Sequence, residues 1–247
     1  MKEQSGFSLS EMLISLFLAS LIAITFSQLY LSSKSQYLKV QELLEINFDL
    51  EWISALLSDS IRKAGFTPCM GIEHLKTNDS RHYGRAIISF QIENTPHPQF
   101  QANRMNEVFT EVVNIVSPTQ VVIPQSVISN IKHPLMISDC RHAEVHKVLK
   151  MDRLVNGYLV TLTKPLMFTY DKTTYLGEWL EERWFIKPNA EGEKTLHYKL
   201  FQTEELSPLV HLFYISTDLI SKKQVFNITV GTDEENIRKL RVSVRSS

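Results

Sequence analysis

The feature that most constrains this chain is a long segment without a glycine or a proline. Residues 7–64 are 58 consecutive residues that lack both, although the 247-residue chain contains 8 Gly and 9 Pro. These two residue types are the strongest breakers of regular secondary structure. The gap therefore predicts one uninterrupted helix, and the glycines and prolines that follow it predict a turn-rich body.

The predicted helix has two halves of different character. Residues 12–33 carry no charge and are mostly apolar, and about 20 such residues span a bilayer as a helix. From Lys34 onward, apolar residues recur mainly at spacings of three or four, which is typical of an amphipathic helix that packs one face on a core. This stripe consists of Val40, Leu43, Leu44, Leu50, Ile53, Leu57, Ile61 and Ala64. Gly65 then suits a left-handed helix cap.

The overall charge excludes several classes of protein. Lys and Arg number 26 against 27 Asp and Glu, so the net charge is -1. A balanced chain gives no reason to expect a nucleic acid as the primary ligand, and it is not an acidic disordered chain. The only cysteines, Cys69 and Cys140, are too far apart in sequence for a CxxC metal or redox motif.

Glu11 is an anomaly at the start of the apolar segment. A carboxylate near the centre of a bilayer costs about 2.5–3.5 kcal/mol or more, so it normally has a partner. Gly6 and Phe7 lie just before it. If the chain were cut between them, Phe7 would carry a new amino terminus and Glu11 would be the fifth residue. Its carboxylate could then neutralise that amine on its own chain or on a neighbouring subunit.

A family resemblance begins at these residues. The string Gly6-Phe7-Ser8-Leu9-Ser10-Glu11, followed by the apolar run, resembles the class III signal of type IV pilins and type II secretion pseudopilins. The resemblance implies that Gly6 is the cleavage residue, that Phe7 becomes the N-methylated terminus, and that Glu11 acts in assembly. Ser8 and Ser10 depart mildly from the usual pattern. An ordinary secretory signal peptide and a plain single-pass anchor are the alternatives, and neither accounts for Glu11.

The body of the chain predicts a β-rich head. Several short runs are rich in β-branched and aromatic residues and are separated by turn residues. The predicted strands are 85–92, 111–116, 120–123, 158–163, 183–186, 196–201, 224–230 and 239–244, and residues 67–110 are expected to be loop-rich. We therefore expect an α+β, pilin-like fold in which the helix stripe covers one face of a mainly antiparallel sheet.

A narrower resemblance extends into this body. The end of the helix, from Asp59 to Phe66 with Cys69 just behind, resembles the PilW-type minor pilins, which tend to read Asp-x-Arg-x-Ala-Gly-aromatic and then Cys. Ser138-Asp139-Cys140 is similar to a later segment of that family, and residues 238–246 are similar to its closing strand. A J-type pseudopilin of a type II secretion system is the main alternative, and a tip adhesin on the same anchor is a further one.

The resemblance implies an organisation and a location. Residues 1–6 would be a cytoplasmic leader, 7–33 the transmembrane half of the helix, 34–66 its amphipathic half, and 67–247 a periplasmic head on a single-pass inner-membrane anchor. The expected partners are other minor pilins, the major pilin and the prepilin peptidase that also methylates. Because the periplasm is oxidising, Cys69 and Cys140 are expected to form a disulfide, with two buried free thiols as the alternative.

No motif predicts catalysis, a cofactor or a bound metal. Cys140, His142 and His146 could share a strand face, but an isolated His pair is more often structural. Trp179 and Trp184 flank charged residues and are expected to belong to the core or its edge. Asn227 matches a glycosylation acceptor but lies in a predicted strand. We therefore expect a non-enzymatic assembly subunit.

Overall fold

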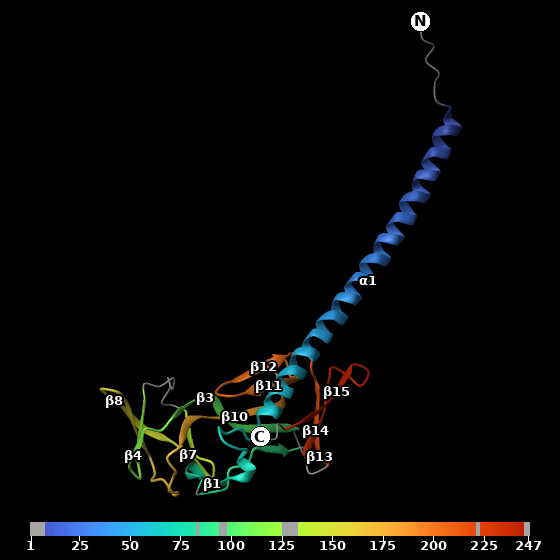
Figure 1. Cartoon of the computed structure of the whole chain (residues 1–247). Helices are drawn as coiled ribbons and strands as arrows, with labels where there is room; N and C mark the ends of the chain where they lie inside the picture. The colour runs from blue at the N-terminus through green and yellow to red at the C-terminus, as the bar shows by residue number, and fades with distance from the viewer. Residues whose placement is uncertain (1–7, 83, 94–97, 125–132, 221–222, 245–247) are drawn as a thin grey trace. The chain divides into compact units, whose positions relative to one another are not determined.

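The computed structural model describes residues 8–82, 84–93, 98–124, 133–220 and 223–244. The chain divides into two compact units, Met1–Asp49 and Leu50–Ser247. A single long helix, α1 (Leu9–Lys63), runs through the first unit and ends in the second, where the β-strands begin (Figure 1). The expected α+β class is confirmed, because a long apolar N-terminal helix precedes a mostly antiparallel β-sheet head.

The largest sheet of the head has eight strands and is organised around β10 (Tyr175–Pro188). One edge of β10 pairs along most of its length with β3 (Gln99–Glu111), and the other edge pairs first with β6 (Leu135–Ser138) and then with β11 (Lys194–Lys199). The remaining strands are β1 (Lys76–Asp79), β2 (Phe90–Glu93), β7 (His142–His146) and β12 (Thr203–Ser207). All pairs are antiparallel except β1 with β7. Two short 3-10 helices, η1 (Ile72–His74) and η2 (Ser80–His82), flank β1.

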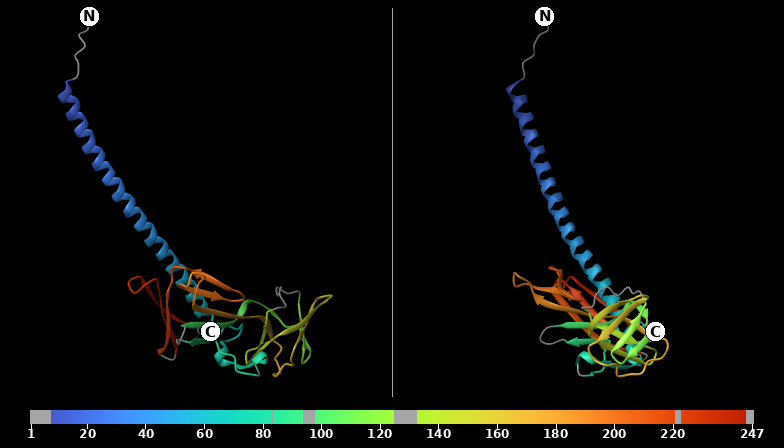
Figure 2. Two further views of the ribbon diagram at one scale, coloured as in Figure 1. Left: turned by 180° about the vertical axis from the view of Figure 1, so that it is seen from behind. Right: turned by 90° about the vertical axis from the view of Figure 1, so that its left-hand side faces the viewer.

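Two smaller antiparallel sheets complete the head. One has the strand order β4 (Asn114–Ser117), β5 (Gln120–Ile123), β9 (Gly157–Leu162) and β8 (Val148–Leu154). The other consists of β13 (Leu212–Ile220), β14 (Lys223–Gly231) and β15 (Ile237–Ser243). Figure 2 shows the two small sheets at opposite ends of the head, with the large sheet between them. The described residues of the head therefore form three sheets, where the sequence predicted one.

The alternation of side chains along β6 shows how the core is built. Leu135 and Ile137 point into a cluster with residues of the four-stranded sheet, such as Val121 and Val160. Met136 points to the opposite face, into a second cluster that includes Trp179. Successive strand residues face opposite sides of a sheet, and all four residues of β6 are buried. The large sheet is therefore covered on both faces at this strand.

The last turns of α1 belong to this core. Ile53, Leu57 and Ile61 are completely buried, as the predicted stripe requires. In the other unit, Val40 and Leu44 of the same stripe are more than half exposed. The prediction that the stripe covers the sheet thus applies to residues 50–64 only. The stripe residues in this segment are three or four apart, so they lie on one face over about four turns.

Several predicted strand boundaries were wrong. Residues 85–92 contribute a strand only from Phe90, and the predicted run 111–116 is split between the end of β3 and the start of β4. The segment predicted to be loop-rich contains β3, which has 13 residues. Alternation in β3 is obscured by Asn103, which is buried, and by Arg104, which is partly buried, because both polar side chains find hydrogen-bond partners in the head. Tertiary partners thus override the local pattern.

Candidate functional site

The helix begins at a capping box that includes Glu11. The backbone N–H of Ser8 donates to Oε2 of Glu11 at 3.1 Å, and the Ser10 N–H donates to the Ser8 hydroxyl oxygen at 3.3 Å. A Ser three residues before a Glu satisfies otherwise unpaired N–H groups at a helix start, where negative charge is also favoured. The Glu11 carboxylate therefore already has a partner in its own chain. Gly6 and Phe7 lie outside the described residues.

Four hydroxyl groups in the apolar half of α1 are paired within the helix. Four hydroxyls donate to backbone carbonyl oxygens three or four residues earlier, at 2.7–2.9 Å. They belong to Ser15, Ser20, Thr25 and Ser27. In hydrocarbon an unpaired polar group is costly, so such internal bonds suit a membrane segment. An 18-residue window of this helix has a mean hydropathy of 2.1, and the helix is long and apolar enough to cross a membrane.

The C-terminal end of α1 is fixed by a left-handed glycine. Gly65 has a φ of +75°, and its N–H donates to the Asn103 carbonyl oxygen at 2.8 Å. A Cβ at this position would lie 2.8 Å from a Glu73 carboxylate oxygen and 2.9 Å from Cβ of Ser89. Only glycine satisfies both the backbone and the space. The glycine of the Ala-Gly-aromatic string is thus a structural requirement of this helix end.

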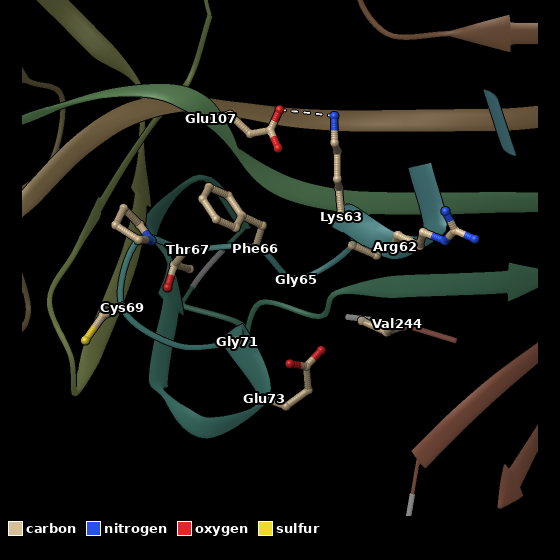
Figure 3. A pocket seen from close by; sticks show the side chains of 12 residues that line it. Arg62, Lys63, Gly65, Phe66, Thr67, Cys69, Gly71, Glu73, Glu107 and Val244 are labelled. Atoms are coloured by element: carbon tan, nitrogen blue, oxygen red, sulfur yellow. Dashed lines mark ion pairs between the residues drawn. The ribbon is translucent and has the colours of Figure 1, made fainter. Parts of the chain in front are cut away.

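A cavity of about 220 Å³ lies beside this helix end (Figure 3). Its charged side chains largely neutralise one another, since the Lys63 ammonium lies 3.1 Å from a Glu107 carboxylate and 3.0 Å from that of Asp59. Figure 3 shows Lys63 and Glu107 on one side of the cavity and Glu73 on the other. The lining residues serve the turn after the helix, and this cavity shows no convergent set of groups for chemistry.

The disulfide that the sequence predicted is formed in the structure. Cys69 and Cys140 are bonded, with their Cα atoms 5.2 Å apart. Asp139 organises the loop around Cys140, because its buried carboxylate accepts the N–H groups of Arg141 at 2.7 Å, His142 at 2.6 Å and Asp171 at 3.2 Å. Burial alone would raise the pKa of Asp139, but these hydrogen bonds to its charged form lower it. The Ser-Asp-Cys segment is therefore a rigid loop attached to the turn after the helix.

Removal of this disulfide is expected to destabilise the head. The double variant Cys69→Ser with Cys140→Ser should lose about 2–4 kcal/mol of unfolding free energy, the typical contribution of a native bridge. Denaturant titration of the full chain in detergent, followed by near-ultraviolet circular dichroism, measures it. Reducing agent should cause a similar loss in the wild type and no further loss in the variant. An unchanged midpoint in the variant would contradict the prediction.

A buried ion pair connects the end of the helix to the sheet. Glu182, 4% exposed on β10, accepts from Nε and Nη2 of Arg104 on β3 at 2.9 and 2.7 Å. Its other oxygen accepts from the Ser60 hydroxyl of α1 at 2.6 Å. Glu182 and Ser60 are buried and Arg104 is partly buried, so the three groups depend largely on one another for their hydrogen bonds. The cluster fixes where the last turns of α1 lie on the large sheet.

Comparison with known protein families finds a match for the N-terminal segment of the chain. A family model described as the prokaryotic N-terminal methylation motif matches residues 1–27. The chain carries this methylation motif. No curated protein and no solved structure matches the chain significantly.

The methylation motif and the long apolar helix are consistent with a type IV pilin, and together they support a pilin-like or pseudopilin subunit. The motif implies processing by a prepilin peptidase and assembly with pilins in general. It also marks the start of the chain as a substrate of modification. A single apolar helix of this length is compatible with membrane anchoring.

The structure does not bring Cys140, His142 and His146 together as a metal site. Cys140 is in the disulfide, and the His142 ring stacks on Phe168 at 4.7 Å. His146 is fully buried, with its Nε2 atom 3.0 Å from a Glu144 oxygen. Within the described ranges, no group of three or more His, Cys, Asp or Glu side chains is placed to hold a metal ion.

The tryptophans and the possible glycosylation acceptor are structural. Trp179 and Trp184 are each 2% exposed, and the Trp179 indole N–H donates to a Glu181 oxygen at 2.9 Å. They therefore belong to the core, as expected. Asn227 lies in β14, and its amide donates to Asp218 on β13 at 2.7 Å.

Sequence reasoning missed a second buried carboxylate. Glu144 on β7 is fully buried and accepts from Asn78, His146, the Tyr170 hydroxyl and two backbone N–H groups. Burial opposes its ionisation, but the hydrogen bond from His146 and those from the backbone lower the pKa of Glu144. The signal in the sequence is an acid between two apolar residues, Ala143 and Val145, inside a strand. It attaches the loop after β9 to the sheet.

Proposed function

We propose that this chain is a PilW-like minor pilin, a non-enzymatic subunit that helps to prime and assemble a type IV pilus. The observation that carries the proposal is the methylation motif of residues 1–27, which leads directly into α1 with Glu11 in its first turn. A β-rich head follows the helix. The family resemblance of the helix end and of the Ser-Asp-Cys segment supports the narrower assignment.

Processing would occur at the start of the chain. Residues 1–6 form the leader in this proposal, Gly6 is the residue before the cut, and Phe7 becomes the N-methylated terminus. Glu11 then lies one helical turn from a positive amine, near enough to neutralise it. The carboxylate also accepts the Ser8 N–H at 3.1 Å, which keeps it directed toward the helix start. Glu11 is the assembly carboxylate in this proposal.

Assembly would transfer the helix from lipid to a helical bundle. Residues 7–33 form the transmembrane half and residues 34–66 the amphipathic half, with the head of residues 67–247 in the periplasm. Both lipid and bundle are apolar, so the transfer exposes little apolar surface to water. The Cys69–Cys140 disulfide supports an oxidising compartment for the head. Other minor pilins and the major pilin would be the partners.

A gene deletion tests the function. Cells that lack this chain are expected to lose surface pili and to regain them when the wild-type gene is supplied, as counted by electron microscopy. Pili that persist while attachment to surfaces fails would favour a tip adhesin instead. Pili that persist while protein secretion fails would favour a J-like pseudopilin. Either of these two results would overturn the assignment to pilus assembly.

A further inference from the structure

A groove of about 340 Å³ lies between the last turns of α1 and the edge of the large sheet. One wall is the helix, with Trp52, Leu56 and Asp59, and the other is the edge strand β12 with Glu204 and Leu206. All of these residues belong to the unit Leu50–Ser247. The proposed processing and assembly residues, Gly6, Phe7 and Glu11, are not among the residues that line this groove.

The floor of the groove is a cross-strand row of side chains. Trp184 on β10 pairs with Tyr198 on β11, which pairs with Glu204 on β12. Residues in such a row point to the same face of a sheet. The Trp184 and Tyr198 rings meet edge to face at 4.8 Å. Trp184 is buried, whereas Tyr198 is half-buried and Glu204 is exposed, so the row emerges from the core into the groove.

The groove holds negative charge that the head does not neutralise. Arg104 is occupied by Glu182, and Asp59 lies 3.0 Å from Lys63. Among the residues that the structure describes, Glu204 has no ion-pair partner. Burial and the charge of Glu182 raise the pKa of Tyr198 to about 12, so its ring stays neutral and adds no further charge. Glu204 is thus the unpaired carboxylate of a groove that the Trp52 and Tyr198 rings also line.

We propose that this groove binds an arginine side chain presented by a neighbouring subunit, an inference that rests on the proposed role in assembly. A guanidinium stacks on aromatic faces and pairs with a carboxylate in one plane, which matches Trp52, Tyr198 and Glu204. Trp52 lines the groove and is 42% exposed. The exposed indole and the unpaired carboxylate of the same groove are complementary to the flat, positively charged guanidinium of an arginine.

Binding can be measured with small probes. The full chain in detergent is titrated with N-acetyl-arginine amide, and N-acetyl-citrulline amide is the neutral control of the same shape. Tryptophan fluorescence should show a saturable change with the arginine probe only, because Trp52 is the exposed indole. Glu204→Gln should weaken the binding about tenfold. Glu205→Gln is the matched control, because the neighbouring residue of a strand points to the opposite face and should bind as the wild type does.

Three results would overturn the proposal, two from this titration and one from a titration with a sugar. The first is an equal response to the arginine and citrulline probes, and the second is an equal loss in Glu204→Gln and Glu205→Gln. A response to N-acetylglucosamine without a response to the arginine probe would also overturn it, in favour of a saccharide site. Both glutamates are exposed, so neither substitution removes a core contact, and unchanged circular dichroism would show that each variant is folded.

A cellular test separates this proposal from the proposed function. Glu204→Arg should reduce surface pili while Glu205→Arg does not, with both variants processed and present in the membrane. Glu11→Ala is examined in the same strains. If Glu11→Ala abolishes pili and Glu204→Arg has no effect, the groove proposal fails and the pilin function stands. If neither variant affects pili, the proposed function itself fails.

Discussion

Replacement of Glu11 by alanine is expected to leave the leader cleaved but to reduce surface filaments to the level of a strain that lacks the gene. The cut would lie before Phe7, four residues ahead of Glu11 in the sequence, so cleavage is not expected to depend on this carboxylate. Assembly is expected to depend on it, because the new amine would otherwise enter an apolar bundle without a counter-charge. Immunoblotting distinguishes the precursor from the mature chain, and electron microscopy counts the filaments.

The matched control for this experiment is Glu42→Ala. Glu42 is an exposed carboxylate on the same helix, beyond the uncharged segment of residues 12–33. Filament number should stay at the wild-type level in that variant. Normal filaments in Glu11→Ala would show that the carboxylate is not the assembly residue. Accumulation of uncleaved precursor would instead show that Glu11 acts in processing.

Glu182→Ala is expected to cost about 3–5 kcal/mol of unfolding free energy, the usual result of removing one partner from a buried ion pair. The substitution leaves the Arg104 guanidinium without its carboxylate, and the Ser60 hydroxyl loses an acceptor at 2.6 Å. Because Ser60 is on α1, the contact between the helix end and the sheet should weaken as well. Denaturant titration of the full chain in detergent measures the loss.

The double variant Arg104→Leu with Glu182→Leu is the control for charge. When both partners become apolar, no buried charge is left unpaired, so most of the loss should be recovered. An equal loss in the single and the double variants would mean that packing, and not the ion pair, holds the helix on the sheet. A loss below about 1 kcal/mol in Glu182→Ala would place the pair among weakly contributing surface bridges.

The parts of this protein that follow from local pattern were predictable. The segment without glycine or proline and its change from uncharged to amphipathic character specified α1. Period-two runs located strands such as β5 and β9 to within a residue. The methylation motif is likewise a contiguous string, and residues 1–27 match its family model.

The tertiary structure alone decided how these elements pair and which polar groups lie inside. The large sheet forms around β10, which pairs with strands that precede it and with a strand that follows it in the sequence. No local periodicity encodes that choice of partners. Glu144 and Glu182 look like surface residues in the sequence, but they are buried, and Arg104 is partly buried, because distant residues satisfy their hydrogen bonds. The groove beside Trp52 also depends on tertiary structure. Its helix wall follows from the local sequence, but its other wall is the edge strand β12, which lies about 150 residues later in the chain.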